Sequence, residues 1–227
     1  MVATIKPWNI EAYHRHVSQL NGNWNLISSP NDLTTKQLAK FKPRYIFFPH
    51  WSWIVPNEIT ETYECVCFHM TDVPYGRGGS PLQNLILRNH KNTKLTALKM
   101  VSELDAGPFY GKLDLSLDGP AQEIFKRAAD LTYVLIQEII ENNPIPVPQQ
   151  GKPVHFQRRK PEQSRLPKTG TIQNLYDHIR MLDAKTYPPA FIEYGDFKLE
   201  LSNASINKEN LECRINIKKK TNENHSN

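Results

Sequence analysis

The sequence predicts an α/β fold with a mostly parallel sheet, helices on both of its faces and a short β-rich extension at the C-terminal end. Three observations predict it. Strand-like and helix-like segments alternate up to residue 141, and two apolar runs at 44–48 and 65–70 fit strands buried on both faces. Prolines then become frequent from Pro144 onward. The 227 residues suffice for one generous domain with a small appendage.

Local patterns assign the elements of the first part. Apolar or alternating runs after a short apolar start at 1–5 predict strands at 25–28, 44–48, 65–70, 93–100 and 112–117. Helical spacing of apolar residues, together with cap and turn residues, predicts helices at 10–20, 35–40, 56–60, 82–89 and 121–141.

The second part begins with a change in composition. Residues 144–170 hold six prolines, which predict an extended arm rather than a packed element. A helix at 171–182, two short strands within 191–202 around a Tyr-Gly-Asp turn and a strand at 211–217 are expected to follow. We therefore divide the chain into a domain at 1–150, an arm with a small β-rich unit at 151–217 and a polar tail at 218–227 that is expected to be disordered.

Composition excludes several classes of protein. The mean hydropathy is −0.57, and no apolar run approaches the roughly 20 residues of a membrane span, so no membrane partner is expected. The N-terminal segment lacks the features of a secretory signal. Three cysteines are too few for a disulfide scaffold, and an odd number cannot all be paired. This count predicts a reducing, cytoplasmic location.

The stretch from 65 to 112 carries the chemistry. His69 lies near the end of a predicted buried strand, and open α/β sheets bind ligands at the carboxyl ends of their strands. Gly76, Gly78 and Gly79 in the following turn are expected to allow a ligand close to the backbone. They form no GxGxxG pattern, so no dinucleotide site is predicted.

Three arrangements remain open for His69 at this point. A carboxylate from Asp105 could orient the ring, and Cys67 could form a nucleophilic Cys/His pair with it. Cys65, Cys67 and His69 share one face of the strand, but a zinc site needs a fourth ligand or water, and no CxxC pair exists. We expect no metal.

The segment 67–111 resembles the formyltransferase family that uses 10-formyltetrahydrofolate. It reads CxHxTDVPYGRGGSPLQNLIL…TKLTALKM…LDAGPFYG, and the separation of its histidine and aspartate, 105 − 69 = 36, fits the family pattern without a gap. The matching positions are His69, Thr71, Pro74, Arg77, Gly78, Thr96 and Asp105. The segment 49–59 is also similar to the family strand and loop that end in PxEI.

The resemblance implies a formyltransferase-type, Rossmann-like fold and an enzyme that transfers a formyl group from 10-formyltetrahydrofolate to an amine. His69 would act as general base, or as an imidazolium that stabilises the tetrahedral oxyanion, while Asp105 orients it and Thr96 supports the site. One position departs from the family: Cys67 replaces an asparagine whose amide helps to hold the formyl oxygen. A thiol is a weak donor, and loss of one oxyanion donor costs about two to three orders of magnitude in rate.

The resemblance also implies where the two substrates bind. The folate is expected to contact Trp51, Ser52, Trp53, Ile54, Arg77, Gly78, Gly79, Ser102, Leu104 and Asp105. The acceptor is expected to contact Thr71, Tyr75, Pro81, Arg158 and Arg159.

For the acceptor, the sequence favours a nucleotide-linked amino sugar. Residues 158–166 (RRKPEQSRL) resemble the RRxPxD arm of nucleotide-sugar formyltransferases, and 179–191 resemble their RALxxPYPGAF segment. This branch includes enzymes of pseudaminic-acid-type pathways, which build surface polysaccharides with UDP-4-amino-4,6-dideoxy sugars. Two alternatives stay open: a methionyl-tRNA formyltransferase-like enzyme and a non-catalytic folate- or nucleotide-sugar-binding module. The modest tail argues against a nucleic-acid partner, and a homodimer through the C-terminal unit stays open.

Overall fold

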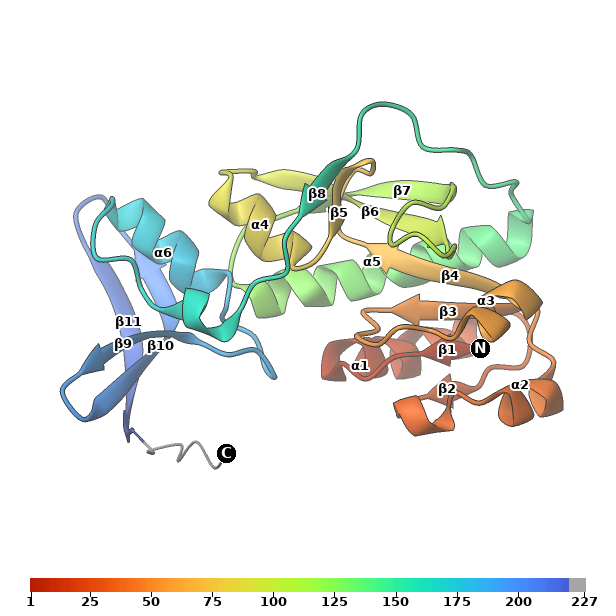
Figure 1. Ribbon diagram of the computed structural model, residues 1–227, viewed down its shortest axis with the longest axis horizontal. Coiled ribbons are helices and arrows are strands. Elements are labelled where there is room, and N and C mark those ends of the chain that lie inside the picture. The colour runs from red at the N-terminus through yellow and green to blue at the C-terminus, as the bar shows by residue number, and fades with distance from the viewer. Residues whose placement is uncertain (221–227) are drawn as a thin grey trace.

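The computed structural model describes residues 1–220 and is built around a six-stranded sheet in the order β2–β1–β3–β4–β6–β7 (Figure 1). Neighbours from β2 to β4 run parallel, and β6 and β7 join as antiparallel strands. The bounds are β1 Val2–Ala3, β2 Leu26–Ile27, β3 Tyr45–Pro49, β4 Glu64–His69, β6 Asn92–Lys99 and β7 Phe109–Ser116. The predicted α/β class with a mostly parallel sheet is confirmed.

Helices cover both faces of this sheet because the strands are apolar on both sides. In β3, Tyr45 and Phe47 belong to one buried cluster with residues of α1, α4 and α5, whereas Ile46 and Phe48 belong to a second cluster with residues of α2 and α3. The helices are α1 Pro7–His16, α2 Thr35–Phe41, α3 Asn57–Thr62, α4 Pro81–Leu87 and α5 Ala121–Asn142. Short 3₁₀ helices span Val17–Gln19, Pro30–Asp32 and Pro161–Ser164.

The proline-rich arm contains packed elements, which corrects the expectation for 144–170. Strand β8 (Val154–Phe156) pairs in parallel with β5 (Tyr75–Gly78), and Phe156 is buried beneath the pair. The prolines at 144, 146, 148 and 153 precede β8, so the backbone donors of β8 remain free to pair. These contacts cross the boundary that the sequence suggested at 150.

The C-terminal unit consists of α6 (Ile172–Arg180) and an antiparallel sheet in the order β11–β10–β9. Its strands are β9 Ala190–Tyr194, β10 Phe197–Ile206 and β11 Leu211–Lys219. Strand β11 thus extends into the segment from 218 onward that was expected to be a tail, and Lys218 pairs with Glu200 at 2.6 Å. Residues 221–227 of that predicted tail lie outside the described residues.

The carboxyl ends of β1, β3 and β4 point toward the arm and the C-terminal unit (Figure 1). The two units share one buried core, because Met181, Leu182, Ala190 and Leu201 join the cluster of α1 and α5. Gln83 of α4 also donates to the carbonyl oxygen of Met181 at 3.0 Å. Within residues 1–220, no helix has the length and apolar character that would let it cross a membrane.

Candidate active site

Strand β4 delivers His69 to the carboxyl-end edge of the sheet. Alternation along the strand puts Cys65, Cys67 and His69 on one face, where Cys65 and Cys67 pack on the buried cluster that includes Ile59. His69 is the last residue of the strand and is only 7% exposed, and its cross-strand partner on β6 is Thr96. The ring is therefore fixed by a rigid element rather than by a loop.

The structure brings Asp105 to His69. The Nδ1 atom of His69 lies 3.5 Å from Oδ2 of Asp105, and its Nε2 lies 2.8 Å from the carbonyl oxygen of Gly76. Since a carbonyl oxygen only accepts, Nε2 carries the proton of that hydrogen bond. Asp105 Oδ2 also accepts a hydrogen bond from the backbone N–H of Gly78 at 2.9 Å. Both ring nitrogens thus face oxygen atoms, which fixes the orientation of the ring.

The turn between β6 and β7 sets the position of the Asp105 carboxylate. Asp105 has φ = 53°, a left-handed conformation that aspartate tolerates better than most residues. Two residues later the chain passes so close to β6 that a Cβ on Gly107 would lie 1.8 Å from the carbonyl oxygen of Lys99. Gly107 is the glycine of the LDAG segment, so its importance was readable from the motif although it was not among the predicted site residues.

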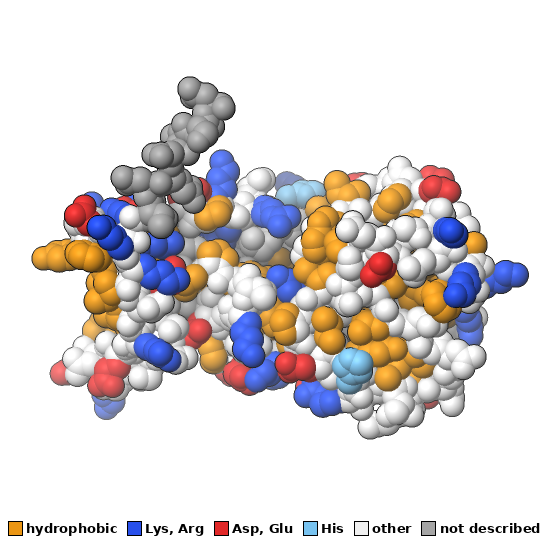
Figure 2. All heavy atoms as spheres, turned by 90° about the horizontal axis from the view of Figure 1, so that it is seen from below, with side chains coloured by type: hydrophobic (Ala, Val, Ile, Leu, Met, Phe, Trp, Pro, Cys, Tyr) orange, Lys and Arg blue, Asp and Glu red, His pale blue; other side chains and the backbone are white. Residues whose placement is uncertain are grey.

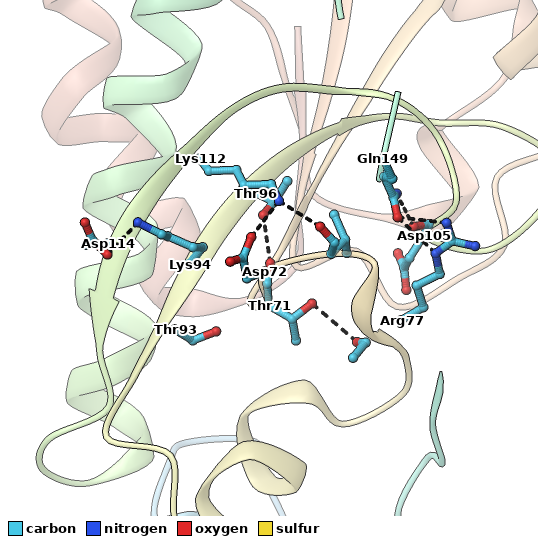
Figure 3. Close-up of polar contacts among 12 residues, drawn as sticks. Thr71, Asp72, Arg77, Thr93, Lys94, Thr96, Asp105, Lys112, Asp114 and Gln149 are labelled. Atoms are coloured by element: carbon cyan, nitrogen blue, oxygen red, sulfur yellow. Dashed lines mark hydrogen bonds and ion pairs between the residues drawn. The ribbon is translucent and has the colours of Figure 1, made fainter. Parts of the chain in front are cut away.

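Arg77 holds this turn through Gln149 (Figure 3). Its Nε and Nη2 donate to Oε1 of Gln149 at 3.0 and 2.8 Å, and its Nη1 lies 3.1 Å from Oε1 of Glu103. Gln149 in turn donates to the carbonyl oxygens of Asp105 and Gly107, both at 2.8 Å. The guanidinium that was expected to contact folate is engaged with the protein, and no local sequence signal pointed to Gln149, which lies 72 residues away.

Thr71 and Thr96 are fully buried and bind each other rather than a ligand (Figure 3). Thr96 Oγ1 donates to the carbonyl oxygen of Thr71 at 2.7 Å, and Thr71 Oγ1 donates to that of Gly76 at 3.4 Å. Lys112 anchors the next two residues through Asp72 Oδ1 and the carbonyl oxygen of Val73, at 2.6 and 2.7 Å. Thr96 supports the loop after His69, whereas Thr71 has no exposed surface for an acceptor.

The glycines after His69 make room for the chain itself, and contact of Gly78 and Gly79 with folate stays a prediction. A Cβ on Gly78 would lie 2.6 Å from the carbonyl oxygen of Phe156, and one on Gly79 would lie 2.5 Å from Cβ of Arg158. Gly76 is similarly close to Phe156, at 2.8 Å. The glycine segment is therefore a docking strip for the arm that carries Arg158.

The two loops predicted to hold folate present apolar side chains near Cys67. Trp51, Cys67 and Met100 all pack on one buried cluster, which brings the loops after β3 and β6 together. Among the residues predicted to contact folate, Ser52, Trp53, Ile54, Ser102 and Leu104 are exposed. The indole Nε1 of Trp51 is buried and has no hydrogen-bond partner among residues 1–220. An unpaired donor beside exposed apolar surface fits a flat heteroaromatic ligand that accepts hydrogen bonds.

The cysteines are held as thiols. Burial and the nearby Asp105 carboxylate raise the pKa of Cys67, and burial raises the pKa of Cys65 to about 12. A protonated Cys67 lacks the thiolate that a nucleophilic Cys/His pair requires. Among the described residues, no three His, Cys, Asp or Glu side chains are grouped to hold a metal ion.

The remaining predicted acceptor residues lie on both sides of the glycine strip. Tyr75 points away from it, with its hydroxyl 3.0 Å from Nε2 of His90. Pro81 is the first residue of α4, and the backbone N–H of Arg159 donates to Oγ of Ser80 at 3.0 Å. Arg158 and Arg159 are therefore beside the glycine strip, while Tyr75 is occupied elsewhere.

Comparisons with known proteins were made over the whole chain. A family model described as "Methionyl-tRNA formyltransferase, C-terminal domain" matches residues 161–218. The solved structure of methionyl-tRNA formyltransferase from Clostridium thermocellum is 44% identical, with a TM-score of 0.93, and the match covers 96% of this chain and 98% of that one. The chain belongs to the formyltransferase family.

Several of the similar proteins are longer than this chain. A methionyl-tRNA formyltransferase from Campylobacter hominis is 30% identical over 198 residues, which are 80% of this chain and 62% of that protein. HypX from Aquifex aeolicus in complex with tetrahydrofolic acid shares the fold with a TM-score of 0.74 at 17% identity, over 89% of this chain and 37% of that one. The chain thus spans about half to two thirds of the length of the curated relatives, such as 50% of those from Bacillus.

These comparisons overturn the assignment to the sugar branch. Solved sugar N-formyltransferases share only 15–16% identity with this chain, against 44% for the C. thermocellum protein. The family model that matches the C-terminal unit is also that of the methionyl-tRNA enzymes. The amino-sugar acceptor, and with it the link to pseudaminic acid and surface polysaccharide, was wrong. The RRKP and YPPAF segments that suggested it are short motifs compatible with more than one acceptor.

Proposed function

We propose that this protein transfers the formyl group of 10-formyltetrahydrofolate to the α-amino group of methionyl-tRNA. The observation that carries the proposal is the 44% identity to a methionyl-tRNA formyltransferase over nearly the full length of both chains. It includes the C-terminal unit, which the family model also matches. An acceptor-binding unit and a catalytic unit of the same family therefore occur together in one chain.

The His69–Asp105 pair would carry the chemistry. The folate supplies an activated formyl group: the acceptor amine attacks the formyl carbon, the bond from that carbon to the folate N10 breaks, and a proton moves from the amine to N10. The Asp105 carboxylate that faces Nδ1 favours the imidazolium role, in which the positive charge of His69 stabilises negative charge on the formyl oxygen. Asp105 keeps the ring oriented and balances its charge.

The loops after β3 and β6 would hold the folate. The unpaired Nε1 of Trp51 offers a hydrogen bond, and Trp53 and Leu104 offer apolar surface that is 47% and 69% exposed. Cys67 would stand beside the formyl group as a weak donor, so most of the oxyanion stabilisation falls to His69 and backbone N–H groups. The homodimer and the cytoplasmic location stay predictions.

The direct test is incubation of the protein with 10-formyltetrahydrofolate and charged initiator methionyl-tRNA, with mass spectrometry of the amino acid released from the tRNA. We expect formyl-methionine, and none with the His69→Ala variant. Absence of formyl-methionine with a folded wild-type protein would contradict the proposal.

The non-catalytic alternative rests on one observation, the replacement of the family asparagine by Cys67. The variant Cys67→Asn separates the two possibilities in the same assay. An inactive parent with an active variant would mean that the chain has lost its activity at this residue. Activity in the parent excludes the non-catalytic module.

A further inference from the structure

A second group of side chains lies next to the candidate active site, where the C-terminal unit meets the ends of β1 and β3. Lys6 follows β1, and its Nζ donates to Oγ1 of Thr186 at 3.2 Å and lies 5.0 Å from the ring centre of Tyr187. His50 follows β3, and its Nε2 lies 2.9 Å from the Tyr187 hydroxyl. We call Lys6, His50, Arg158, Arg159 and Tyr187 the basic waist.

The arm adds two arginines to the basic waist. Arg158 packs against Gly79. Burial of Lys6 lowers its pKa, and the positive charge of Arg158 lowers that pKa further. Arg159 is fixed through Ser80, its Nη2 donates to the carbonyl oxygen of Gln163, and its Nε is buried without a hydrogen-bond partner among residues 1–220. Within the described part of the chain, Lys6, Arg158 and Arg159 have no carboxylate within 4.0 Å. Figure 2 shows Lys and Arg side chains on both units and between them.

Two further features mark this place, and the first of them adds a positive potential. The ten-residue helix α1 begins at Pro7 with Lys6 as its N-cap and has no acidic residue in its first turn, so its N-terminal end is uncompensated. On the other side, the Nε2 of His178 is unpartnered among residues 1–220 in a side chain that is 7% exposed. Burial and the charge of Arg159 lower the pKa of His178. Uncompensated, partly buried cations at a helix N-terminus fit a phosphate group.

The spacing to His69 suits one part of the proposed substrate. Strands β1 and β4 are separated only by β3, so their ends lie two strand spacings apart, about 10 Å. In an aminoacyl-tRNA the reacting amine is joined through the ester and ribose of the terminal adenosine to the phosphate that precedes it. An amine held at His69 thus leaves that phosphate in reach of the basic waist.

We propose that Lys6 and Arg158 bind the phosphate that links the last two nucleotides of the acceptor tRNA. This proposal rests on the proposed function for the identity of the nucleic acid. Arg158 and Lys6 supply charge-assisted hydrogen bonds to the phosphate oxygens. The C-terminal unit contributes to this site because it places residues 186 and 187 against the ends of β1 and β3.

The test is calorimetric binding of the trinucleotide CCA and of the same trinucleotide with a neutral methylphosphonate in the last linkage. We expect the wild type to bind the charged form roughly 10- to 100-fold more tightly, the loss expected for hydrogen bonds to a charged group. The double variant Lys6→Gln/Arg158→Gln removes both positive charges, keeps a polar side chain at each position and should bind both forms equally. Lys36→Gln, an exposed lysine on α2, is the matched control and should keep the preference.

Equal binding of the two trinucleotides to the wild type, no binding of either, or a preference that survives in the double variant would overturn the proposal. Formylation of methionyl-tRNA is measured in parallel, where the double variant should raise KM without lowering kcat. An active wild type without the preference leaves the proposed function standing and removes the phosphate site. An inactive wild type with the preference removes the proposed function and leaves the phosphate site standing.

Discussion

Two histidines at the same edge of the sheet have opposite surroundings. His69 ends β4, and His50 follows β3, its parallel neighbour. His69 is surrounded by oxygen acceptors, the carboxylate of Asp105 and the carbonyl of Gly76. His50 is packed against the rings of Trp8, Phe125 and Tyr187, close to the positive charge of Lys6.

The difference shows how one fold separates two tasks over a short distance. Burial and the charge of Lys6 lower the pKa of His50 to about 3, so this ring stays neutral at neutral pH and contributes shape and one hydrogen bond. In the proposed function, the side of His69 handles a proton and developing negative charge. The proposed phosphate site lies on the side of His50, where Lys6 supplies positive charge.

The largest expected effect comes from replacing His69. A separate variant in which His50 is replaced serves as the comparison. His69→Ala should lower kcat for formyl transfer by about 10²- to 10⁴-fold, the usual contribution of a positioned acid–base group. His50→Asn should leave kcat nearly unchanged, because asparagine tolerates the left-handed φ of 52° at this position and His50 lies outside the proposed chemistry. Steady-state kinetics check both, with thermal melting to show that each variant folds. Equal losses of kcat in the two variants would contradict the division of tasks between the two histidines.

Asp105→Asn should give the next largest loss, about 10²-fold in kcat. The amide can still accept the hydrogen bond from the N–H of Gly78, but it removes the negative charge that faces Nδ1 of His69. Kinetics with the folate concentration varied should show an effect on kcat rather than on KM. Normal activity would mean that Asp105 serves only as a turn residue.

Part of the His69 side could be predicted from the sequence because it follows from local patterns. The apolar run at 65–70 placed His69 at a strand end, and the alternating run at 93–100 placed Asp105 in the turn after the next sheet strand. The spacing of 36 residues linked the two. These features depend on secondary structure and on one motif, both of which are written in contiguous residues.

The His50 side could not be predicted, because it depends on contacts between distant segments. Lys6 meets Thr186 across 180 residues, and His50 meets Tyr187 across 137. The same holds for Arg77, whose partner Gln149 lies in the arm that was expected to stay unpacked. Glycines that seemed free for a ligand were filled by that arm, and only the β5–β8 pairing reveals this.

A smaller effect is expected at Cys67, which lies between the two loops proposed for folate. Because the pKa of its thiol is raised, Cys67 stays protonated at neutral pH and reacts slowly with alkylating agents. Cys67→Ala should change kcat by less than about tenfold, since a thiol is a weak donor. Kinetics of the variant and mass spectrometry after iodoacetamide treatment at pH 7.5 measure both points. Rapid alkylation with loss of all activity would instead support the hypothesis of a nucleophilic Cys/His pair.

The smallest expected effect concerns the pH dependence of stability on the His50 side. The folded-state pKa of about 3 lies below the unfolded value of 6.5, so unfolding takes up a proton between these two values. The contribution of neutral His50 is complete above pH 6.5 and is lost as the pH falls toward 3, with a slope of at most about 1.4 kcal/mol per pH unit. Urea unfolding of wild type and His50→Asn at several pH values isolates this term, because all other titrating groups are common to both. The variant should lose less stability on acidification, whereas parallel curves would place His50 in contact with water and weaken the contrast between the two histidines.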